Sequence, residues 1–350
     1  MKYSEEIKNF QIKDKPLILG IETSCDETAV SLVYCGREVL ADEIISSAAE
    51  HAVFGGVVPE IASRVHTTAI LTATRNALEK AGKKLSDIDA VAVTYGAGLL
   101  GALLVGVSFA KALAFSLGVP LVPVSHIRGH IAAAYLADKT LEPPFMNILA
   151  SGGHTALIAV EDYRSMRVLG HSIDDAAGEA FDKVARVLGL SYPGGPSVEK
   201  LAKEGNNTVK LPAMLSHYEG GAYDFSYSGL KTAVINYVHN AEQKGESWSK
   251  EDVAASFQHA AIDVLVNKAI KAAKEYGYKT VAVTGGVAAN GYLRETLKNA
   301  AEKNGLKSVI PEKKICTDNG SMIGAEGYIQ YKAGNFADLT LNASAVVPLK

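Results

Sequence analysis

Two parts of this 350-residue chain repeat the same short pattern, and the repetition strongly constrains the fold. The segment Val91-Ala92-Val93-Thr94 recurs identically at positions 281–284, and a glycine turn and a helical segment follow it both times. Thr28-Ala29-Val30 is similarly matched by Thr155-Ala156-Leu157. Because unbroken apolar runs of this kind are typical of strands buried on both faces, the pattern predicts a duplicated α/β architecture. We expect two lobes with a cleft between them, where ligands commonly bind.

The length agrees with two lobes, because one hydrophobic core rarely serves more than roughly 250–300 residues. We expect an N-terminal extension at residues 1–16, an N-terminal α/β lobe at 17–137 and a C-terminal α/β lobe at 138–350. Strands are expected at 17–22, 29–34, 39–45, 90–94, 121–124, 145–150, 156–160, 168–172, 280–284 and 308–310. Helices are expected at 59–81, 99–117, 126–136, 179–188, 197–203, 229–241, 253–275, 292–303 and 321–331.

Charge and cysteine content narrow the class of protein. A net charge of −3 means that any contact with nucleic acid requires local basic patches or a partner protein. The three cysteines have no paired spacing and no signal peptide is recognisable, so we expect a cytoplasmic protein. Residues 90–110 carry no charge, but a strand, a glycine turn and a helix containing Lys111 account for them better than a membrane span does.

His126 and His130 are candidate metal ligands. Residues four apart lie on one face of a helix, with Cβ atoms about 5–6 Å apart, so both imidazoles can reach one ion. Asp318, just before the last expected helix, is a plausible third ligand. Two histidines and one carboxylate leave coordination positions open for a substrate, as in non-haem Fe²⁺ or catalytic Zn²⁺ sites. A histidine pair at this spacing also occurs without metal, so a structural role stays open.

Glycine-rich turns are candidate phosphate- and nucleoside-binding segments, because glycine has no Cβ and lets a ligand approach the main chain. One such turn, residues 151–155, follows an expected strand. An earlier turn, residues 20–28, offers Ser24 and Glu27 as phosphate-turn residues, with an ordinary polar hairpin as the alternative. Residues 192–196 and 284–290 each open a helix, which also suits a nucleotide. No Walker-type P-loop sequence occurs.

These motifs, taken in order and with their spacing, closely resemble the TsaD family, also called Gcp or YgjD, whose members are tRNA N6-adenosine threonylcarbamoyltransferases. The resemblance runs from about Leu17 to Gly334. It implies an actin-like, sugar-kinase-like (ASKHA) fold of two duplicated lobes around a nucleotide cleft. The segments that carry it are 20–28, 126–130, 149–155, 178–183, 192–196, 225–232, 285–290 and 317–321.

The resemblance also implies ligands at individual positions. It places one divalent metal at His126, His130 and Asp318, with Fe²⁺ expected and Zn²⁺ as the alternative. The adenine nucleotide is expected to be threonylcarbamoyl-AMP, or ATP or ADP. The positions implied for it are Leu149, Ala150, Ser151, Gly152, Gly153, Asp182, Gly195, Glu199 and Asn290.

The implied reaction transfers the threonylcarbamoyl group from threonylcarbamoyl-AMP to the N6 amine of the adenosine beside the anticodon, giving t6A in tRNAs that read ANN codons. This amine is a poor nucleophile because its lone pair is delocalised, so a mixed-anhydride donor and a Lewis-acid metal suit the chemistry. The implied partners are tRNA, TsaB-like and TsaE-like subunits, and a TsaC-like synthase that supplies the donor, with no membrane. The exposed part of helix 59–81 is expected to dock a related subunit.

Other functions stay open at this point. A small-molecule kinase of the same ASKHA class would need a group positioned to deprotonate the acceptor hydroxyl, and would not need two histidines with Asp318. A metallopeptidase would need a glutamate directly after the first histidine to activate water, where this chain has Ile127. A non-catalytic, nucleotide-dependent assembly module would not depend on His126.

Overall fold

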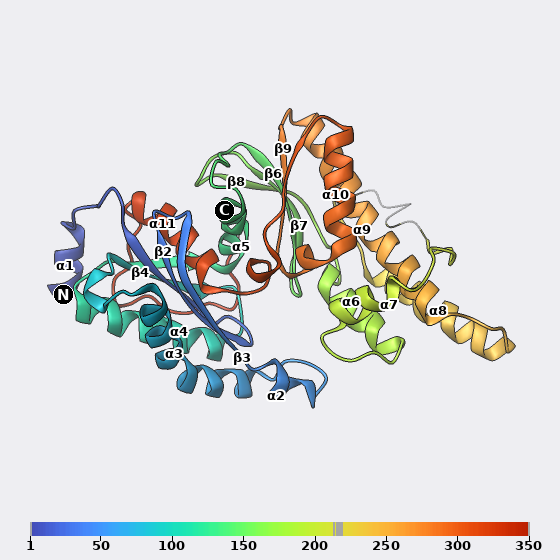
Figure 1. Ribbon diagram of the computed structural model, residues 1–350, viewed down its shortest axis with the longest axis horizontal. Coiled ribbons are helices and arrows are strands. Elements are labelled where there is room, and N and C mark those ends of the chain that lie inside the picture. The colour runs from blue at the N-terminus through green and yellow to red at the C-terminus, as the bar shows by residue number, and fades with distance from the viewer. Residues whose placement is uncertain (1, 213, 215–219, 349–350) are drawn as a thin grey trace. The chain divides into compact units, whose positions relative to one another are not determined.

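The computed structural model describes residues 2–212, 214 and 220–348, and the chain folds into two units. Unit 1 is made of Met1–Leu141 together with Asp318–Lys350, and unit 2 is Glu142–Thr317. Each unit is built around its own five-stranded sheet (Figure 1).

The sheet of unit 1 has the strand order β3-β2-β1-β4-β5. Its central strand β1 pairs antiparallel with β2 and parallel with β4, and β4 pairs parallel with β5. The strands are β1 (Leu17–Glu22), β2 (Glu27–Tyr34), β3 (Glu38–Ser46), β4 (Ala90–Gly96) and β5 (Leu121–Ser125).

Helices cover both faces of this sheet. Leu19 and Ile21 of β1 share a core with α3 and α4, whereas Ile18 packs with α5 and α11. Successive strand residues point to opposite faces of a sheet. Glu22 is four residues after Ile18, so its side chain points to the same face, toward α5 and α11. The helices are α1 (Lys2–Lys8), α2 (Ala48–Ala52), α3 (Pro59–Ala81), the 3-10 turn η1 (Leu85–Asp87), α4 (Leu100–Leu117), α5 (His126–Ala137) and α11 (Gly320–Lys332).

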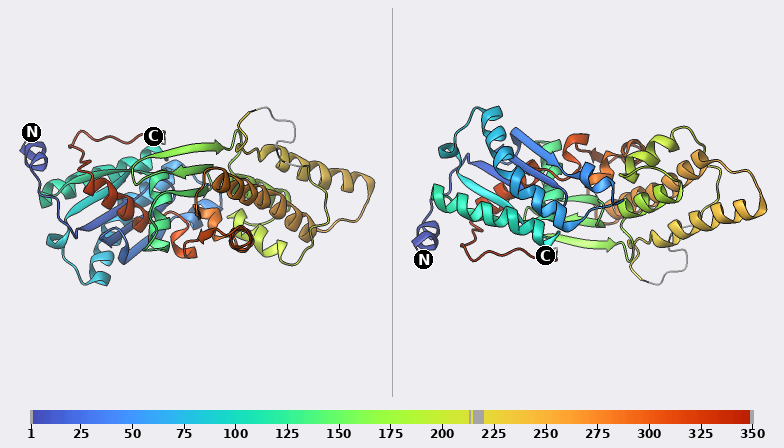
Figure 2. Two further views of the ribbon diagram at one scale, coloured as in Figure 1. Left: turned by 90° about the horizontal axis from the view of Figure 1, so that it is seen from above. Right: turned by 90° about the horizontal axis from the view of Figure 1, so that it is seen from below.

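The sheet of unit 2 has the order β10-β9-β6-β7-β8, with strands β6 (Phe145–Ala150), β7 (Thr155–Val160), β8 (Met166–His171), β9 (Thr280–Thr284) and β10 (Lys307–Val309). A single apolar core joins this sheet to the surrounding helices. Residues 245–249 connect the ends of the two long helices α8 and α9 (Figure 2). The helical elements are α6 (Ala177–Val187), α7 (Gly194–Ala202), α8 (Ser228–Lys244), α9 (Lys250–Glu275), η2 (Gly286–Ala289), α10 (Gly291–Lys303) and η3 (Lys313–Ile315).

The two sheets have the same topology, so the prediction of a duplicated α/β fold is confirmed. In unit 2, β6 pairs antiparallel with β7 and parallel with β9, as β1 pairs with β2 and β4 in unit 1. The repeated sequence Val-Ala-Val-Thr lies in β4 and in β9, which are equivalent strands. The sequence repeat therefore marks a structural repeat.

The ends of the chain differ from the expected lobe boundaries. The sequence suggested a C-terminal lobe at 138–350, but α11 packs on β1 and α5 and so belongs to unit 1. The expected extension at residues 1–16 contains helix α1, where Tyr3 and Ile7 are buried and the Tyr3 hydroxyl donates a hydrogen bond to the Val119 carbonyl at 2.8 Å. Both differences arise because segments far apart in the sequence pack together, and a local sequence pattern does not reveal such contacts.

Helix α4 is, among the described residues, the single helix long and apolar enough to cross a membrane by length and composition. One of its sides is buried against the sheet through small and aliphatic residues such as Ala102, Val107 and Ala110. Its Lys111 donates a hydrogen bond to the Leu341 carbonyl at 3.0 Å. Helix α4 is therefore buried along one side only, whereas the sequence suggested a buried helix.

Helix α11 approaches β1 very closely, and glycine makes this possible. A Cβ atom at Gly20 would overlap the carbonyl oxygen of Gly320 and the backbone of Gly324. Backbone atoms cannot rotate away from such an overlap as a side chain can. Glycine at position 20 therefore sets the distance between the sheet and α11.

We expect Gly20→Ala to destabilise the protein by about 3 kcal/mol or more, at the upper end of the usual cost of overpacking, because backbone must move. Urea unfolding followed by circular dichroism would measure this. Gly56→Ala is the matched control, since a Cβ there meets no atom within 4 Å. Equal stability of the two variants would contradict the close-packing account.

Candidate metal centre and nucleotide-binding turn

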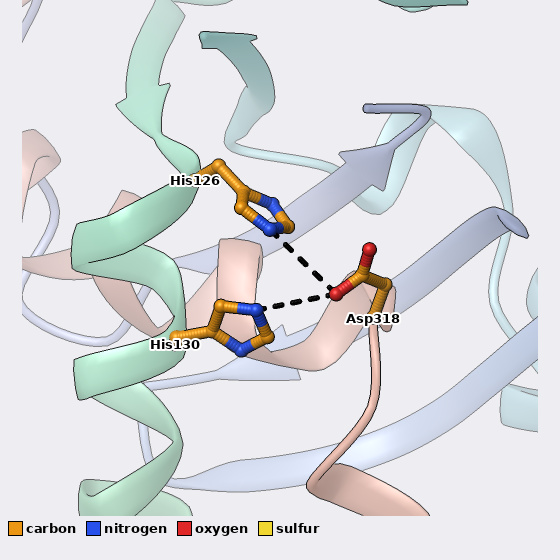
Figure 3. Close-up of side chains that lie close together, drawn as sticks. All are labelled: His126, His130 and Asp318. Carbon is orange, nitrogen blue, oxygen red and sulfur yellow. Dashed lines mark ion pairs between the residues drawn. The ribbon is translucent and has the colours of Figure 1, made fainter. Parts of the chain in front are cut away.

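The structure brings together the three side chains that the sequence suggested as metal ligands. Their ligand atoms all lie within 4.8 Å of one another. Asp318 Oδ1 lies 3.6 Å from His126 Nε2 and 3.2 Å from His130 Nε2. Figure 3 shows both imidazoles projecting from one helix, α5, toward the aspartate. These residues all belong to unit 1.

Local structure explains why the three groups meet. His126 and His130 occupy the first turn of α5 and lie on one face of it, because they are four residues apart. Asn319 caps α11 by accepting a hydrogen bond from the Met322 amide at 2.8 Å, so Asp318 stands directly before a fixed helix start. The packing of α11 on α5 then places the aspartate opposite the histidines.

Negative charge gathers around these groups. Burial lowers the pKa of His126, but the carboxylates of Asp318 and Glu22 outweigh burial and raise the pKa to about 9. Burial, followed by the charges of Asp26 and Asp318, raises the pKa of Glu27 well above its usual range. Surroundings that hold an extra proton so firmly also favour a metal cation.

Glu22 orients His126, and this role was not predicted from the sequence. The fully buried Glu22 places Oε2 3.1 Å from His126 Nδ1 and accepts a hydrogen bond from the Thr94 hydroxyl at 2.6 Å. A carboxylate on Nδ1 keeps the proton there and leaves Nε2 as the metal-facing atom. The sequence signal that could have indicated this role is an acidic residue at the end of an otherwise apolar strand.

The residues fit a divalent metal on two observations. His130 is 1% exposed, and within the described residues its ring nitrogens form no hydrogen bond of good geometry, Nε2 having only the ion-pair contact of 3.2 Å with Asp318 Oδ1. A buried polar atom without such a bond is costly, and a metal ion would satisfy it. Two imidazoles and one carboxylate are also the donor set of non-haem iron sites and of some catalytic zinc sites.

The turn between β1 and β2 brings Ser24 beside His126. Ser24, expected at a phosphate, is buried with its hydroxyl 3.1 Å from His126 Nδ1. Glu27, the other expected residue, accepts a hydrogen bond from Ser46 at 3.2 Å. Burial and the nearby carboxylates of Asp26 and Asp318 raise the pKa of the Cys25 thiol far above its usual range, so this cysteine is no activated nucleophile.

The glycine turn of unit 2 presents bare main chain. The Ser151 amide donates to the His154 carbonyl at 2.8 Å, and the His154 amide donates to the Ser151 hydroxyl at 3.1 Å, which closes the turn. Gly152 and Gly153 are exposed, and a Cβ on either would meet no protein atom within 4 Å. Packing within the protein therefore does not require glycine here, and the main chain of the turn is open to the approach of a ligand.

Two of the other expected nucleotide residues of unit 2 accept hydrogen bonds from the first amides of neighbouring helices. Asp182 accepts a hydrogen bond from the Gly194 amide at 2.7 Å, and burial raises its pKa. Glu199 accepts one from the Gly291 amide at 3.1 Å. Gly195 has open space around its α-carbon. Leu149 and Ala150 are buried at the end of β6, so only their main chain can reach a ligand.

Asn290 is held by two neighbours. Its side chain accepts a hydrogen bond from the Leu293 amide at 3.0 Å, which caps α10, and donates one to Gln258 at 2.8 Å. Gln258, which is buried on α9, was missed in the sequence. A buried glutamine in a helix gives no local signal of its partner.

Comparison with solved structures identifies the fold class. The chain is similar to HypF of T. kodakarensis, with a TM-score of 0.62 and 18% identity over 91% of this chain and 48% of that one. It is also similar to the (R)-2-hydroxyglutaryl-CoA dehydratase component A of Acidaminococcus fermentans, with a TM-score of 0.54 and 17% identity over 91% of this chain and 99% of that one. The predicted ASKHA class, actin-like and sugar-kinase-like, is confirmed.

Sequence comparison defines the family within that class. The model of the TsaD family, tRNA N6-adenosine threonylcarbamoyltransferase, matches residues 38–325. Proteins of that name from Clostridium perfringens and Moorella thermoacetica are 52% and 53% identical to this chain, over 94% and 95% of it and 97% of each relative. The chain belongs to the TsaD family.

We expect His130→Ala to weaken the binding of Zn²⁺ or Fe²⁺, because one of three ligands is lost. The loss should exceed the about ten- to hundredfold that removal of an outer hydrogen-bonding partner costs. Competition with a chelator, with metal content measured by elemental analysis, would show it. His171→Ala is the control, since His171 is exposed on β8 of unit 2. Equal metal content in the two variants would rule out this centre.

Proposed function

We propose that this protein transfers the threonylcarbamoyl group from threonylcarbamoyl-AMP to the N6 amine of the adenosine beside the anticodon, giving t6A in tRNAs that read ANN codons. Identity above 50% to curated tRNA N6-adenosine threonylcarbamoyltransferases, over almost the whole of both chains, carries the proposal. The protein is thus an acyltransferase, and the kinase and peptidase alternatives have no support from these relatives.

The metal centre supports this chemistry. His126, His130 and Asp318 would hold one divalent ion, with Fe²⁺ expected and Zn²⁺ as the alternative. A bound ion supplies Lewis-acid chemistry and neutralises charge on the anhydride donor. Glu22 keeps the proton of His126 on Nδ1. That glutamate is hydrogen-bonded and buried, so it is not available to activate water as a peptidase base would be.

The nucleotide part of the donor is assigned to unit 2. The amides of the exposed Gly152 and Gly153 would bind phosphate oxygens, with Leu149 and Ala150 contributing main chain only. AMP is a good leaving group from a mixed anhydride, so no general acid is required. The remaining positions assigned to the adenylate are Asp182, Gly195, Glu199 and Asn290.

The proposed partners follow from charge and family. A net charge of −3 suggests that subunits of TsaB and TsaE type help to bind the tRNA, and a TsaC-type synthase would supply the donor. All of these act in the cytoplasm, where we place this protein. No membrane is involved in the proposal.

A groove between α3 and α4 in unit 1 is the proposed docking face for the TsaB-like subunit. It has a volume of about 440 Å³ and is lined by Thr67, Ile70, Leu104, Val105 and Ser108. Among the described residues, four large apolar side chains are exposed on these two helices, and together they form a surface suited to a partner: Leu71 at 66%, Leu100 at 50%, Leu104 at 40% and Phe115 at 60%.

The reaction can be tested with purified protein, its partner subunits, threonylcarbamoyl-AMP and unmodified tRNA. Mass spectrometry of the tRNA nucleosides should show t6A, and Asp318→Ala should abolish it while His171→Ala leaves it unchanged. Unmodified adenosine in the presence of intact donor, metal-loaded protein and tRNA would refute the proposal.

The docking face can be tested by co-purification. We expect Leu104→Glu to release the TsaB-like subunit, because a charge would be buried in an apolar contact. Leu85→Glu is the control, since Leu85 is similarly exposed but lies on η1. Retention of the partner by the Leu104 variant would place the interface elsewhere.

A further inference from the structure

A buried ion pair joins α5, which carries the two proposed histidine ligands, to α11, which begins two residues after Asp318. Arg128 of α5 places Nε 2.7 Å from Oε1 of Glu326 in α11. The arginine side chain is 11% exposed and the glutamate is fully buried. Both partners face the interior of unit 1.

The pair lies on the rigid elements that position the ligands. Arg128 stands between His126 and His130 in the same helix. Glu326 belongs to α11, whose first residue follows Asp318 by two positions, and Asn319 caps that helix. A movement of α11 along α5 would therefore carry Asp318 with it.

The apolar contacts between these helices do not by themselves define their register. Gly129 lets them approach closely, since a Cβ there would lie 2.7 Å from Ile323 Cδ1. Hydrophobic contact of this kind is non-directional. A shift of one residue along a helix is about 1.5 Å, whereas metal–ligand distances tolerate about 0.2 Å. A directional contact is needed to hold the aspartate within that tolerance.

Stability alone gives a weak reason for burying these charges. Replacing a buried ion pair by apolar residues of similar size is often neutral or stabilising. Glu326 Oε1 also accepts a hydrogen bond from Gln330 at 2.6 Å, but Oε2 has no hydrogen-bond partner within the described residues. What the charge-assisted bond adds is a fixed geometry between the two helices.

We propose that Arg128 and Glu326 are positioning residues of the metal centre. Their ion pair fixes the register of α11 against α5, so that Asp318 meets His126 and His130 at coordinating distance. The proposal rests on the proposed metal centre and extends it by naming what sets its geometry.

The test uses the full-length protein and Co²⁺, whose visible spectrum reports coordination geometry. In the double variant Arg128→Met, Glu326→Met the two helices can still pack through apolar side chains. We expect the urea midpoint of unfolding to be unchanged. Co²⁺ binding should weaken about ten- to a hundredfold, as when other residues that support metal ligands are removed, and the Co²⁺ absorption spectrum should change. A merely structural pair would change stability and leave the spectrum as it was.

Rescue and control variants sharpen the result. The reversed pair Arg128→Glu, Glu326→Arg restores a charged contact and should recover most of the Co²⁺ affinity. Lys13→Met with Asp89→Asn removes the ion pair near the start of β1, which lies at the end of that strand away from Glu22, and should change neither affinity nor spectrum. If the double methionine variant does not fold, Arg128→Lys, which keeps the charge but loses the planar guanidinium, should show a smaller loss.

The positioning role would be overturned if the double methionine variant bound Co²⁺ with wild-type affinity and spectrum. If only Arg128→Lys folds, the same result in that variant would overturn it. The metal centre itself would stand in that case. A wild-type protein that binds no Co²⁺ would refute both the metal centre and the positioning role.

Discussion

The close packing of α11 on β1 and α5 is the constraint on which the proposed site depends. It requires glycine at Gly20, where a Cβ would overlap the backbone of α11, and it is aided by Gly129, where a Cβ would crowd the Ile323 side chain. It also brings Asp318, which is distant in sequence, to the two histidines of α5. Without that packing, unit 1 would contain a histidine pair with no carboxylate opposite it.

The sequence predicted the fold well wherever local pattern decides it. Strands at 17–22, 145–150 and 280–284 and the helix at 59–81 have the expected bounds, because apolar periodicity and glycine turns define them. The assignment of α11 to unit 1 depends on contacts across the whole chain, which no local pattern contains. The short helices α1 and α2 were missed because each has too few residues to show a period.

The candidate site was predictable to a similar degree. The spacing of His126 and His130 and the nature of Asp318 suggested a metal, and the structure brings these three groups together. The carboxylate behind His126 was not predicted, because the position of Glu22 depends on which face of β1 meets α5. Ser24, for which the sequence suggested a phosphate, lies beside His126, and this neighbour also depends on packing between distant segments.

The order of the chain has a consequence for how the centre is assembled. His126 and His130 leave the ribosome long before Asp318, because all of unit 2 is translated between them. A nascent chain that already contains five strands of unit 1 therefore still lacks the carboxylate and the helix that follows it. The full set of three proposed ligands can therefore form only after unit 2 has been translated.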